Sequence, residues 1–397
     1  MISSAPPLPF DNLWYSVSSY TALNNWRAGG MPFSRRRLIL GAVLFIGLIV
    51  VTSTLRLAYE WRQALNDIDS MIVTPVAISL PTDGSTSNNV AQFPPAGVMS
   101  QAAAAAQGAD NASLSTTPGA ETTPTLRQQT LNILLLGTDA RPDDIAPTRT
   151  DAVVLVRLDR DNGRVSMLSI PRDLWVTYPS GGSGRINAAF AVGEKKFGPG
   201  GGAALAKSTV GKLLNIQVDQ FVLINFQGFK TLIDRLGGIT VDVPDAINDP
   251  AYPTDDYGTI SVSFPVGPQQ LDGDHALIYA RTRHADSDFG RNQRQQLVLM
   301  AIFNRVRERG LLQQLTSLDD YTGALRGYVQ TDMGHSTMLA VAGFARNLHP
   351  DTVLRYAIDS TTIVDLHPPA TFAAEPRSLR RIVAQFTGES TSTAGGE

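Results

Sequence analysis

The chain has 397 residues, and its 33 Lys or Arg against 36 Asp or Glu give a formal net charge of -3. A nucleic-acid-binding protein needs a basic surplus on its binding face, so we expect no nucleic acid among the partners. Cysteine is absent, which excludes a disulfide framework and a cysteine-ligated metal. One globular domain is expected, because the first third of the chain lacks the pattern of a packed core.

An uncharged apolar run near the N-terminus covers the eighteen residues Leu38–Leu55. As a helix it would span roughly 27 Å, close to the thickness of a bilayer core. Residues 35–37 are all arginine, so the positive-inside rule places the tail 1–37 in the cytoplasm. We predict a single-pass signal anchor in the cytoplasmic membrane, with an extracytoplasmic domain. A cleavable signal peptide is the alternative, but the run is long and no small-x-small site follows it closely.

Composition changes sharply after the predicted anchor. Residues 56–129 are rich in Pro, Thr, Ser, Ala and Gln and lack the apolar periodicity that builds a core. We interpret this segment as an extracytoplasmic low-complexity tether with a reach of roughly 40 Å. A globular domain is predicted to cover residues 130–386, and the last residues, 387–397, are predicted to form a disordered tail.

Strand and helix patterns alternate from Leu131 onward. β-Branched apolar runs that end in Gly, Pro or an Asp-Asn-Gly turn indicate strands of one buried sheet, and amphipathic stretches between later runs indicate helices. This alternation predicts an α/β fold with a central mixed β-sheet flanked by helices. The predicted strands are Ile133–Leu136, Ala152–Leu158, Val165–Ile170, Phe221–Asn225, Ile239–Val243 and Val353–Ile358, and the predicted helices are Gly201–Leu214, Phe226–Leu236, Leu297–Arg309 and Pro376–Phe386.

Charged residues follow or precede the first three predicted strands. Asp139 follows the first strand, Asp151 enters the second, and Arg172 follows the third. Taken alone, each aspartate is more often a turn or cap residue. If the strand ends meet at one sheet edge, however, two carboxylates there suit Mg²⁺, with Mn²⁺ as the alternative, since these ions take oxygen ligands and leave room for phosphate.

The stretch Tyr279–Gln296 concentrates arginine and aspartate with almost nothing apolar between them, so it is poor core material. Guanidinium groups grip phosphate oxygens two at a time, and carboxylates among them favour a phosphate site that also handles a metal or a proton. The alternative is an ion-pair cluster that faces water. The charged side chains are Arg281, Arg283, Asp286, Asp288, Arg291 and Arg294.

Other catalytic patterns are missing from the sequence. Gly201–Ser208 has the outline of a phosphate-binding P-loop, but Ala206 stands where the second glycine is needed, so no nucleotide is expected. The chain has no G-x-S-x-G elbow and no cysteine nucleophile, which excludes the usual routes to an acyl-enzyme.

Six motifs together resemble the LytR-CpsA-Psr (LCP) family over Leu131 to Arg309. They are LLLGTDAR, RTDAVVLVRLD, SIPRDLWV, GRINAAFA, FQGFKTLIDRLGGITVDV and YARTRHADSDFGRNQRQQ, in the family's order and spacing. The resemblance implies an enzyme that transfers a glycopolymer from a polyprenyl-pyrophosphate carrier to a peptidoglycan hydroxyl. It also implies Mg²⁺ at the pyrophosphate and an apolar pocket for the lipid tail.

The resemblance assigns roles to individual residues. Asp139 and Asp151 are expected to hold the metal, and together with Arg172, Arg281 and Arg283 they form the expected catalytic set. The resemblance does not identify the base; the charged residues offer Asp286, Asp288 and Asp151 as candidates, and geometry must decide among them. The expected pyrophosphate contacts are Arg141, Arg172, Arg185, Arg281, Arg283, Arg291 and Gln293.

Two other functions fit the same residues. The domain would be a phosphatase if water were the acceptor, or a lipid- or wall-binding protein if it captured the pyrophosphate without turnover. Acceptor recognition is expected on the loop Asp245–Thr259, and the sequence does not identify the glycopolymer.

Overall fold

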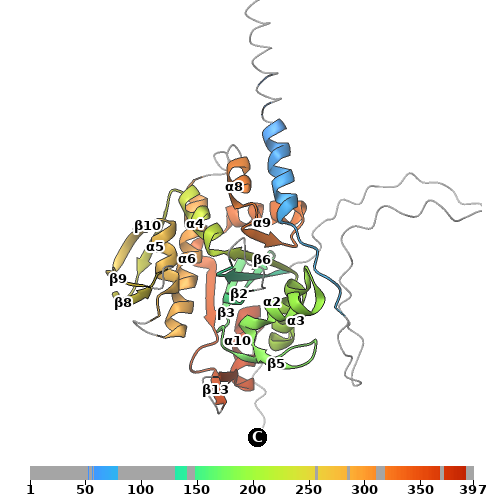
Figure 1. Ribbon diagram of the computed structural model, residues 1–397, viewed down its shortest axis with the longest axis vertical. Coiled ribbons are helices and arrows are strands. Elements are labelled where there is room, and N and C mark those ends of the chain that lie inside the picture. The colour runs from blue at the N-terminus through green and yellow to red at the C-terminus, as the bar shows by residue number, and fades with distance from the viewer. Residues whose placement is uncertain are drawn as a thin grey trace, which may run out of the picture. The chain divides into compact units, whose positions relative to one another are not determined.

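The computed structural model describes Thr52, Arg56 and residues 58–78, 130–140, 148–254, 258–283, 287–309, 318–366 and 371–389. The chain divides into two compact units, Met1–Tyr59 and Glu60–Glu397, and the second contains the fold described below (Figure 1). Apart from Thr52, the predicted anchor Leu38–Leu55 lies outside the described residues. Within the described ranges, no helix has the length and apolarity needed to cross a membrane.

The core of the second unit is a mixed sheet of six strands: β1 (Thr130–Thr138), β2 (Thr150–Asp159), β3 (Arg164–Ser169), β6 (Gln220–Asn225), β11 (Val329–Thr331) and β12 (Val353–Ala357). Their order is β11-β6-β1-β2-β3-β12. β1 pairs antiparallel with β2 and parallel with β6, and β3 pairs antiparallel with β2 and parallel with β12. The predicted mixed sheet flanked by helices is confirmed, and the first three apolar runs are its neighbouring strands.

Alternate side chains of these strands enter two different cores, because successive residues of a strand point to opposite faces. Leu134 and Leu155 pack in a cluster on one face, and Ile133 and Val154 pack in a cluster on the other. The first face is covered by α2 (Ala189–Phe197), α3 (Gly201–Leu214) and α10 (Pro376–Thr387), and the second by α6 (Asp288–Glu308) and α9 (His335–Asn347).

A third apolar cluster lies beside the sheet. It joins α6 to two further helices and two small antiparallel ribbons, in which β7 pairs with β10 and β8 with β9. The loop expected at Asp245–Thr259 contains the strand Ile247–Pro253, in which Ile247, Asp249 and Tyr252 are buried and the other residues are exposed. The elements are α4 (Phe226–Arg235), β7 (Ile239–Val243), β8 (Ile247–Pro253), β9 (Thr259–Phe264), β10 (Gly267–Leu271) and α5 (Gly273–Arg281).

Part of the polar stretch Tyr279–Gln296 is buried, although its composition indicated poor core material. It contains the end of α5 and the first turns of α6, which begins nine residues before the helix predicted from Leu297. Ser287 caps α6 by accepting a hydrogen bond from the Gly290 amide. Side chains at 291, 292, 294 and 296 are each no more than 5% exposed. Polar side chains remain buried here because several of them bind backbone carbonyls, as described below.

Residues 60–78 also belong to the second unit, although we predicted them to be tether. Residues 60–71 are helical, and Asp67 forms an ion pair of 3.2 Å with Arg326. Ile72 then pairs with Thr331 of β11, and the Val73 amide donates to the Thr331 carbonyl at 2.7 Å. The predicted tether therefore cannot begin at residue 56.

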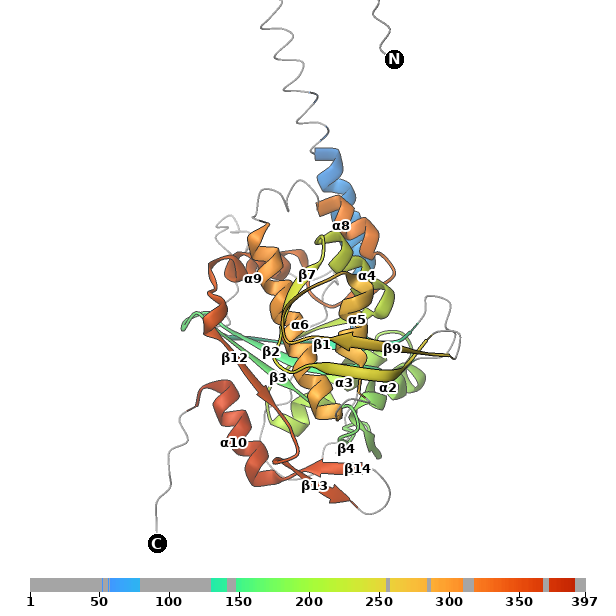
Figure 2. The same ribbon diagram turned by 90° about the vertical axis from the view of Figure 1, so that its left-hand side faces the viewer.

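The remaining elements lie at the periphery. Residues 60–71 lie at one end of this unit, whereas α10 and the β13–β14 ribbon lie at the other, as two perpendicular views agree (Figures 1 and 2). The elements not yet given are β4 (Trp175–Thr177), β5 (Ser183–Arg185), the short helices Ile186–Ala188 and Pro350–Thr352, α8 (Leu318–Leu325), β13 (Ile363–Leu366) and β14 (Thr371–Ala374).

Candidate functional site

A cavity of about 390 Å³ lies between one face of the sheet and the helices α4, α5 and α6. Its walls are mostly apolar, so an aliphatic chain inside it would be removed from water. This burial contributes roughly 25 cal/mol for each Å² of apolar surface. The apolar wall residues include Leu135 of β1, Val154 of β2, Ile224 of β6, Phe226 and Phe229 of α4, Leu277 of α5, and Val298, Leu299 and Ile302 of α6.

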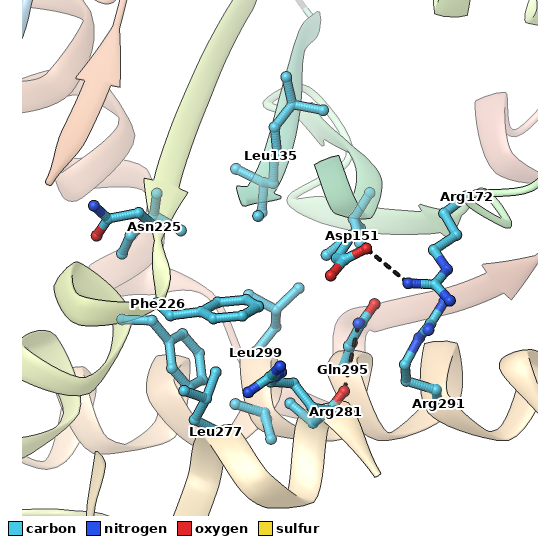
Figure 3. A pocket seen from close by; sticks show the side chains of 18 of the residues that line it. Leu135, Asp151, Arg172, Asn225, Phe226, Leu277, Arg281, Arg291, Gln295 and Leu299 are labelled. Carbon is cyan, nitrogen blue, oxygen red and sulfur yellow. Dashed lines mark hydrogen bonds and ion pairs between the residues drawn. The ribbon is translucent and has the colours of Figure 1, made fainter. Parts of the chain in front are cut away.

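Charged side chains gather at one part of the cavity lining (Figure 3). They come from strand ends and from the junction of α5 and α6, which the fold brings to one sheet edge. The end of β1, the start of β2 and the end of β3 meet there because β2 runs antiparallel to both neighbours. The polar lining residues are Asp151, Arg172, Asn225, Asp249, Arg281, Thr282, Arg283, Arg291 and Gln295.

Asp151 lies at an irregularity in the β1–β2 pairing. Gly137 pairs with Ala152 and Thr138 with Thr150, so Asp151 is the extra residue of a β-bulge. A bulge changes the direction of a side chain relative to its strand, which here places Asp151 on the cavity. Its Oδ1 accepts a hydrogen bond of 2.7 Å from Nη1 of Arg172.

Arg172 is surrounded by three carboxylates. Besides Asp151, its Nε lies 3.5 Å from Oδ2 of Asp173 and 3.9 Å from Oδ2 of Asp288. Burial alone lowers the pKa of Arg172, but the hydrogen bond and charge of Asp151, with the charges of Asp288 and Asp173, raise it above its usual value. The guanidinium is therefore held in a fixed orientation beside the cavity.

Arg291 is the most deeply buried cation of the cavity lining, with a side chain only 4% exposed. Its Nη1 lies 3.0 Å from Oδ1 of Asp288, whereas its Nε and Nη2 have no hydrogen-bond partner among the described residues. Burial, followed by the nearby positive charge of Arg172, lowers the pKa of Arg291. An anion placed between the two guanidiniums would relieve their repulsion and accept the unpaired donors.

Arg281 is held by two aromatic side chains, Phe226 and Tyr252. Its Cζ lies 4.4 Å from the ring centroid of Phe226, within the range of a cation–π interaction. Its Nη1 donates a hydrogen bond of 3.1 Å to the Tyr252 hydroxyl. These two contacts restrict the side chain before any ligand is bound.

Backbone carbonyls at the end of α5 are bound by Arg294, which is 5% exposed. Its Nε donates to the Tyr279 carbonyl at 3.1 Å, and its Nη2 donates to the Thr282 carbonyl. The Thr282 hydroxyl in turn donates to Oδ2 of Asp249, which is fully buried. This network fixes the segment that carries Arg281 and Arg283, so Arg294 has a structural task.

The structure brings five of the predicted site residues to one cavity: Asp151, Arg172, Arg281, Arg283 and Arg291. Asp288 is ion-paired to two of these arginines. Asp139 is exposed one residue beyond β1, at the same sheet edge. Arg185 does not line the cavity, but its Nη1 lies 3.3 Å from Oδ1 of Asp173, which contacts Arg172. Arg141 and Asp286 lie outside the described residues.

Gln293 is exposed on α6 and does not line the cavity, whereas Gln295 does. The pyrophosphate contact of Gln293 stays a prediction. Arg291 and Gln295 are four residues apart, a spacing that places both on one face of a helix. Gln295 was missed because the predicted helix began only at Leu297. Tyr252 and Phe226 were also missed, since their roles depend on contacts between distant segments.

The cation site was tested against the described residues. None of them form a group of three or more His, Cys, Asp or Glu side chains suited to a metal. Mg²⁺ commonly uses only one or two carboxylates and completes its shell with phosphate oxygens and water. The contact of Arg172 with Asp151 uses Oδ1. Asp139 and Asp151 at one sheet edge therefore fit a Mg²⁺ that arrives with a phosphorylated ligand.

Fold and cavity together define an α/β domain whose apolar cavity ends in a cluster of arginines. The chain belongs to the LytR_cpsA_psr family, whose sequence profile matches residues 97–367. It is 35% identical over 222 residues to the polyisoprenyl-teichoic acid–peptidoglycan teichoic acid transferase TagU of Oceanobacillus iheyensis. That alignment covers 55% of this chain and 64% of the relative, so the chain spans less than two thirds of the relative's length.

Solved structures show the same fold. The crystal structure of Bacillus subtilis TagV has a TM-score of 0.53 and 27% identity, and the match covers 66% of this chain and 97% of TagV. A structure of TagT bound to LIIa-WTA has a TM-score of 0.52 and 28% identity, with 66% of this chain and 91% of TagT covered. The resemblance to the LytR-CpsA-Psr family is thereby confirmed.

Proposed function

We propose that this protein is a membrane-anchored phosphotransferase. It moves a glycopolymer from a polyprenyl-pyrophosphate carrier to a peptidoglycan hydroxyl and forms a phosphodiester link. The observation that supports this most directly is Arg291, whose buried, unpaired donors lie beside Arg172 in the lining of an apolar cavity. A pyrophosphate on an aliphatic chain matches both parts of that cavity, and the named activities of relatives such as TagU agree with it.

In this reaction the acceptor hydroxyl oxygen attacks the phosphorus that carries the glycan. The bond from that phosphorus to the bridging oxygen breaks, and polyprenyl phosphate leaves. Arg172, Arg281, Arg283 and Arg291 bind the pyrophosphate oxygens, and each well-placed donor stabilises the developing charge by roughly 2–4 kcal/mol in a site that excludes water. Arg141, Arg185 and Gln293 remain proposed supporting contacts.

The acceptor proton passes to a carboxylate beside the arginines. Asp288 is one candidate for this base, since its Oδ1 lies 3.0 Å from Nη1 of Arg291 at the first turn of α6. Asp286 and Asp151 are the other candidates for this base. Asp139 and Asp151 would hold Mg²⁺, or Mn²⁺ in its place, and when bound this ion would neutralise charge on the pyrophosphate oxygens.

We also propose that Leu38–Leu55 anchors the chain in the cytoplasmic membrane, with the N-terminus inside. The apolar run and the arginines at 35–37 support this topology. Residues 387–397 remain a proposed tail.

The test incubates the full chain in detergent with a polyprenyl-pyrophosphoryl saccharide and peptidoglycan fragments, with and without Mg²⁺. Mass spectrometry identifies the products. A glycan–phosphate–peptidoglycan adduct is expected only with the metal. Free glycan phosphate without an adduct would refute the transferase function and indicate a phosphatase. Intact bound lipid without any product would refute it and indicate a binding protein.

A further inference from the structure

A second concave surface lies between β4, β14, α3 and α10, with a volume of about 380 Å³. We call it the Trp175 groove. Its lining includes Trp175 and Thr177 of β4, Lys212 of α3 and Arg380 of α10. Trp175 is 40% exposed, which makes it one of the few large apolar side chains of this domain that face water.

The groove combines three chemical features. The Trp175 indole offers a flat apolar ring, the hydroxyl of Thr177 offers a hydrogen-bonding group, and Lys212 and Arg380 offer positive charge, while none of the described residues that line the groove carries a carboxylate. Sugar rings present an apolar C–H face and polar edges, so they stack on indoles while their hydroxyls bind polar neighbours. The two cations add a preference for a saccharide that carries carboxylates.

A row of charged side chains connects this groove to the cavity. Trp175 and Arg185 are direct partners in the β4–β5 pairing, so their side chains lie on the same face of that ribbon. Arg185 is ion-paired to Asp173 at 3.3 Å, and Asp173 lies 3.5 Å from Arg172. A chain molecule in the groove could therefore extend as far as the catalytic arginine.

The two concave surfaces lie on opposite faces of the sheet. The cavity is covered by α4, α5 and α6, whereas the groove is formed by α3 and α10, which cover the other face. In phosphoryl transfer the attacking and leaving oxygens lie roughly in line with the phosphorus between them. With the leaving lipid phosphate in the cavity, the acceptor must arrive from the other side.

The groove also lies near α10 and β14, at the end of this unit away from residues 60–71 (Figures 1 and 2). The chain enters the unit through those residues. Under the proposed topology, the anchor precedes those residues in the chain, whereas the groove lies at the other end of this unit.

We propose that the Trp175 groove is the acceptor subsite and binds a glycan strand of peptidoglycan, an amino-sugar chain that bears carboxylates. Trp175 stacks on a sugar ring, Lys212 and Arg380 bind carboxylates, and the strand presents its hydroxyl to the phosphorus beside Arg172. This inference rests on the proposed function, and it names the part of the molecule that selects the acceptor.

The test compares Trp175→Ala and Arg380→Glu with matched controls in the full chain. Arg381→Glu changes the next residue of α10, which is exposed but does not line the groove, and Trp61→Ala removes a tryptophan that is 37% exposed at the other end. Calorimetry measures binding of purified, uncrosslinked glycan strands without donor lipid, and steady-state assays measure kcat and the acceptor KM. Thermal melting confirms that each variant is folded.

The groove variants are expected to weaken strand binding and raise the acceptor KM about tenfold, with donor binding unchanged, while the controls change either quantity less than twofold. Unchanged strand binding in both groove variants would overturn the proposal. Weaker donor binding with unchanged strand binding would show that the groove binds the donor glycopolymer, and this result would also overturn the proposal. Calorimetry needs no turnover, so it tests the groove independently of the proposed function. If the protein is a phosphatase but still binds glycan strands through Trp175, the transferase function is refuted and the groove assignment is retained.

Discussion

Arg291 and Arg294 are both buried in α6, three residues apart, yet the structure gives them opposite energetic roles. Arg291 has one ion pair and two donor atoms without a hydrogen-bond partner in the described part of the chain, whereas Arg294 binds two backbone carbonyls. We predict that Arg291→Met leaves the free energy of unfolding unchanged or raises it, and that Arg294→Met lowers it.

The magnitudes follow from the contacts. An unmet buried donor costs about 1–3 kcal/mol, and a buried ion pair replaced by an apolar side chain is often neutral or stabilising by about 1–4 kcal/mol. Asp288 would keep its contact with Arg172 at 3.9 Å and its access to water, so Arg291→Met should change stability by about 0 to +2 kcal/mol. Arg294→Met removes the hydrogen bonds to the Tyr279 and Thr282 carbonyls, with an expected loss of roughly 2–5 kcal/mol.

The assay is thermal and urea unfolding of both variants, with and without inorganic pyrophosphate. At a ligand concentration one hundred times Kd, binding stabilises the native protein by about 2.7 kcal/mol, and this increment should be present in the wild type and lost in Arg291→Met. A loss of several kcal/mol in Arg291→Met would show that Arg291 holds the fold together. Equal stabilisation of the wild type and Arg291→Met by pyrophosphate would show that Arg291 does not bind the pyrophosphate.

Three further results are expected. Tyr252→Phe keeps the ring but removes the hydroxyl that orients Arg281, so kcat should fall about threefold to thirtyfold with little change in Tm; an unchanged kcat would show that stacking alone suffices. Gly193→Ala would place its Cβ 2.3 Å from a backbone oxygen and should lower the free energy of unfolding by more than about 2 kcal/mol. Gly343→Ala in α9 meets open space and should raise it by up to about 1 kcal/mol. Urea unfolding measures both changes. A chelator should abolish turnover without lowering Tm, because two carboxylates at a sheet edge are too few to support folding; a large drop in Tm would indicate a structural metal.

The sheet and most of its helices were predictable because their patterns are local. The apolar runs that became β1, β2 and β3 end at Gly, Pro or a turn, and α3 has the predicted bounds Gly201–Leu214. The meeting of Asp151 and Arg172 was also predictable, since adjacent strand ends share a sheet edge. Their direct hydrogen bond depends on a bulge, and the sequence does not show where a strand gains a residue.

The site was harder to predict where long-range packing decides the outcome. The stretch around Arg294 appeared too polar for an interior, because its carbonyl partners, Tyr279 in α5 and Thr282 directly after it, lie at the end of a helix that composition did not reveal. The β8–β9 ribbon was missed because Pro and Asp residues interrupt the alternation of apolar and polar residues that indicates a strand. The contact between Arg281 and Phe226 joins segments 55 residues apart in the chain, and no local pattern encodes such a contact.

The docked segment 60–78 changes how the length of the low-complexity region should be understood. Residues 60–78 and β1 both belong to this compact unit, so the two ends of the intervening stretch belong to one body. That stretch does not determine how far the unit can move from its attachment point. With the predicted span ending at Leu55, only residues 56–59 separate it from Glu60 along the chain. Lengthening residues 79–129 should therefore be tolerated, whereas inserting residues directly before Glu60 would increase the working height.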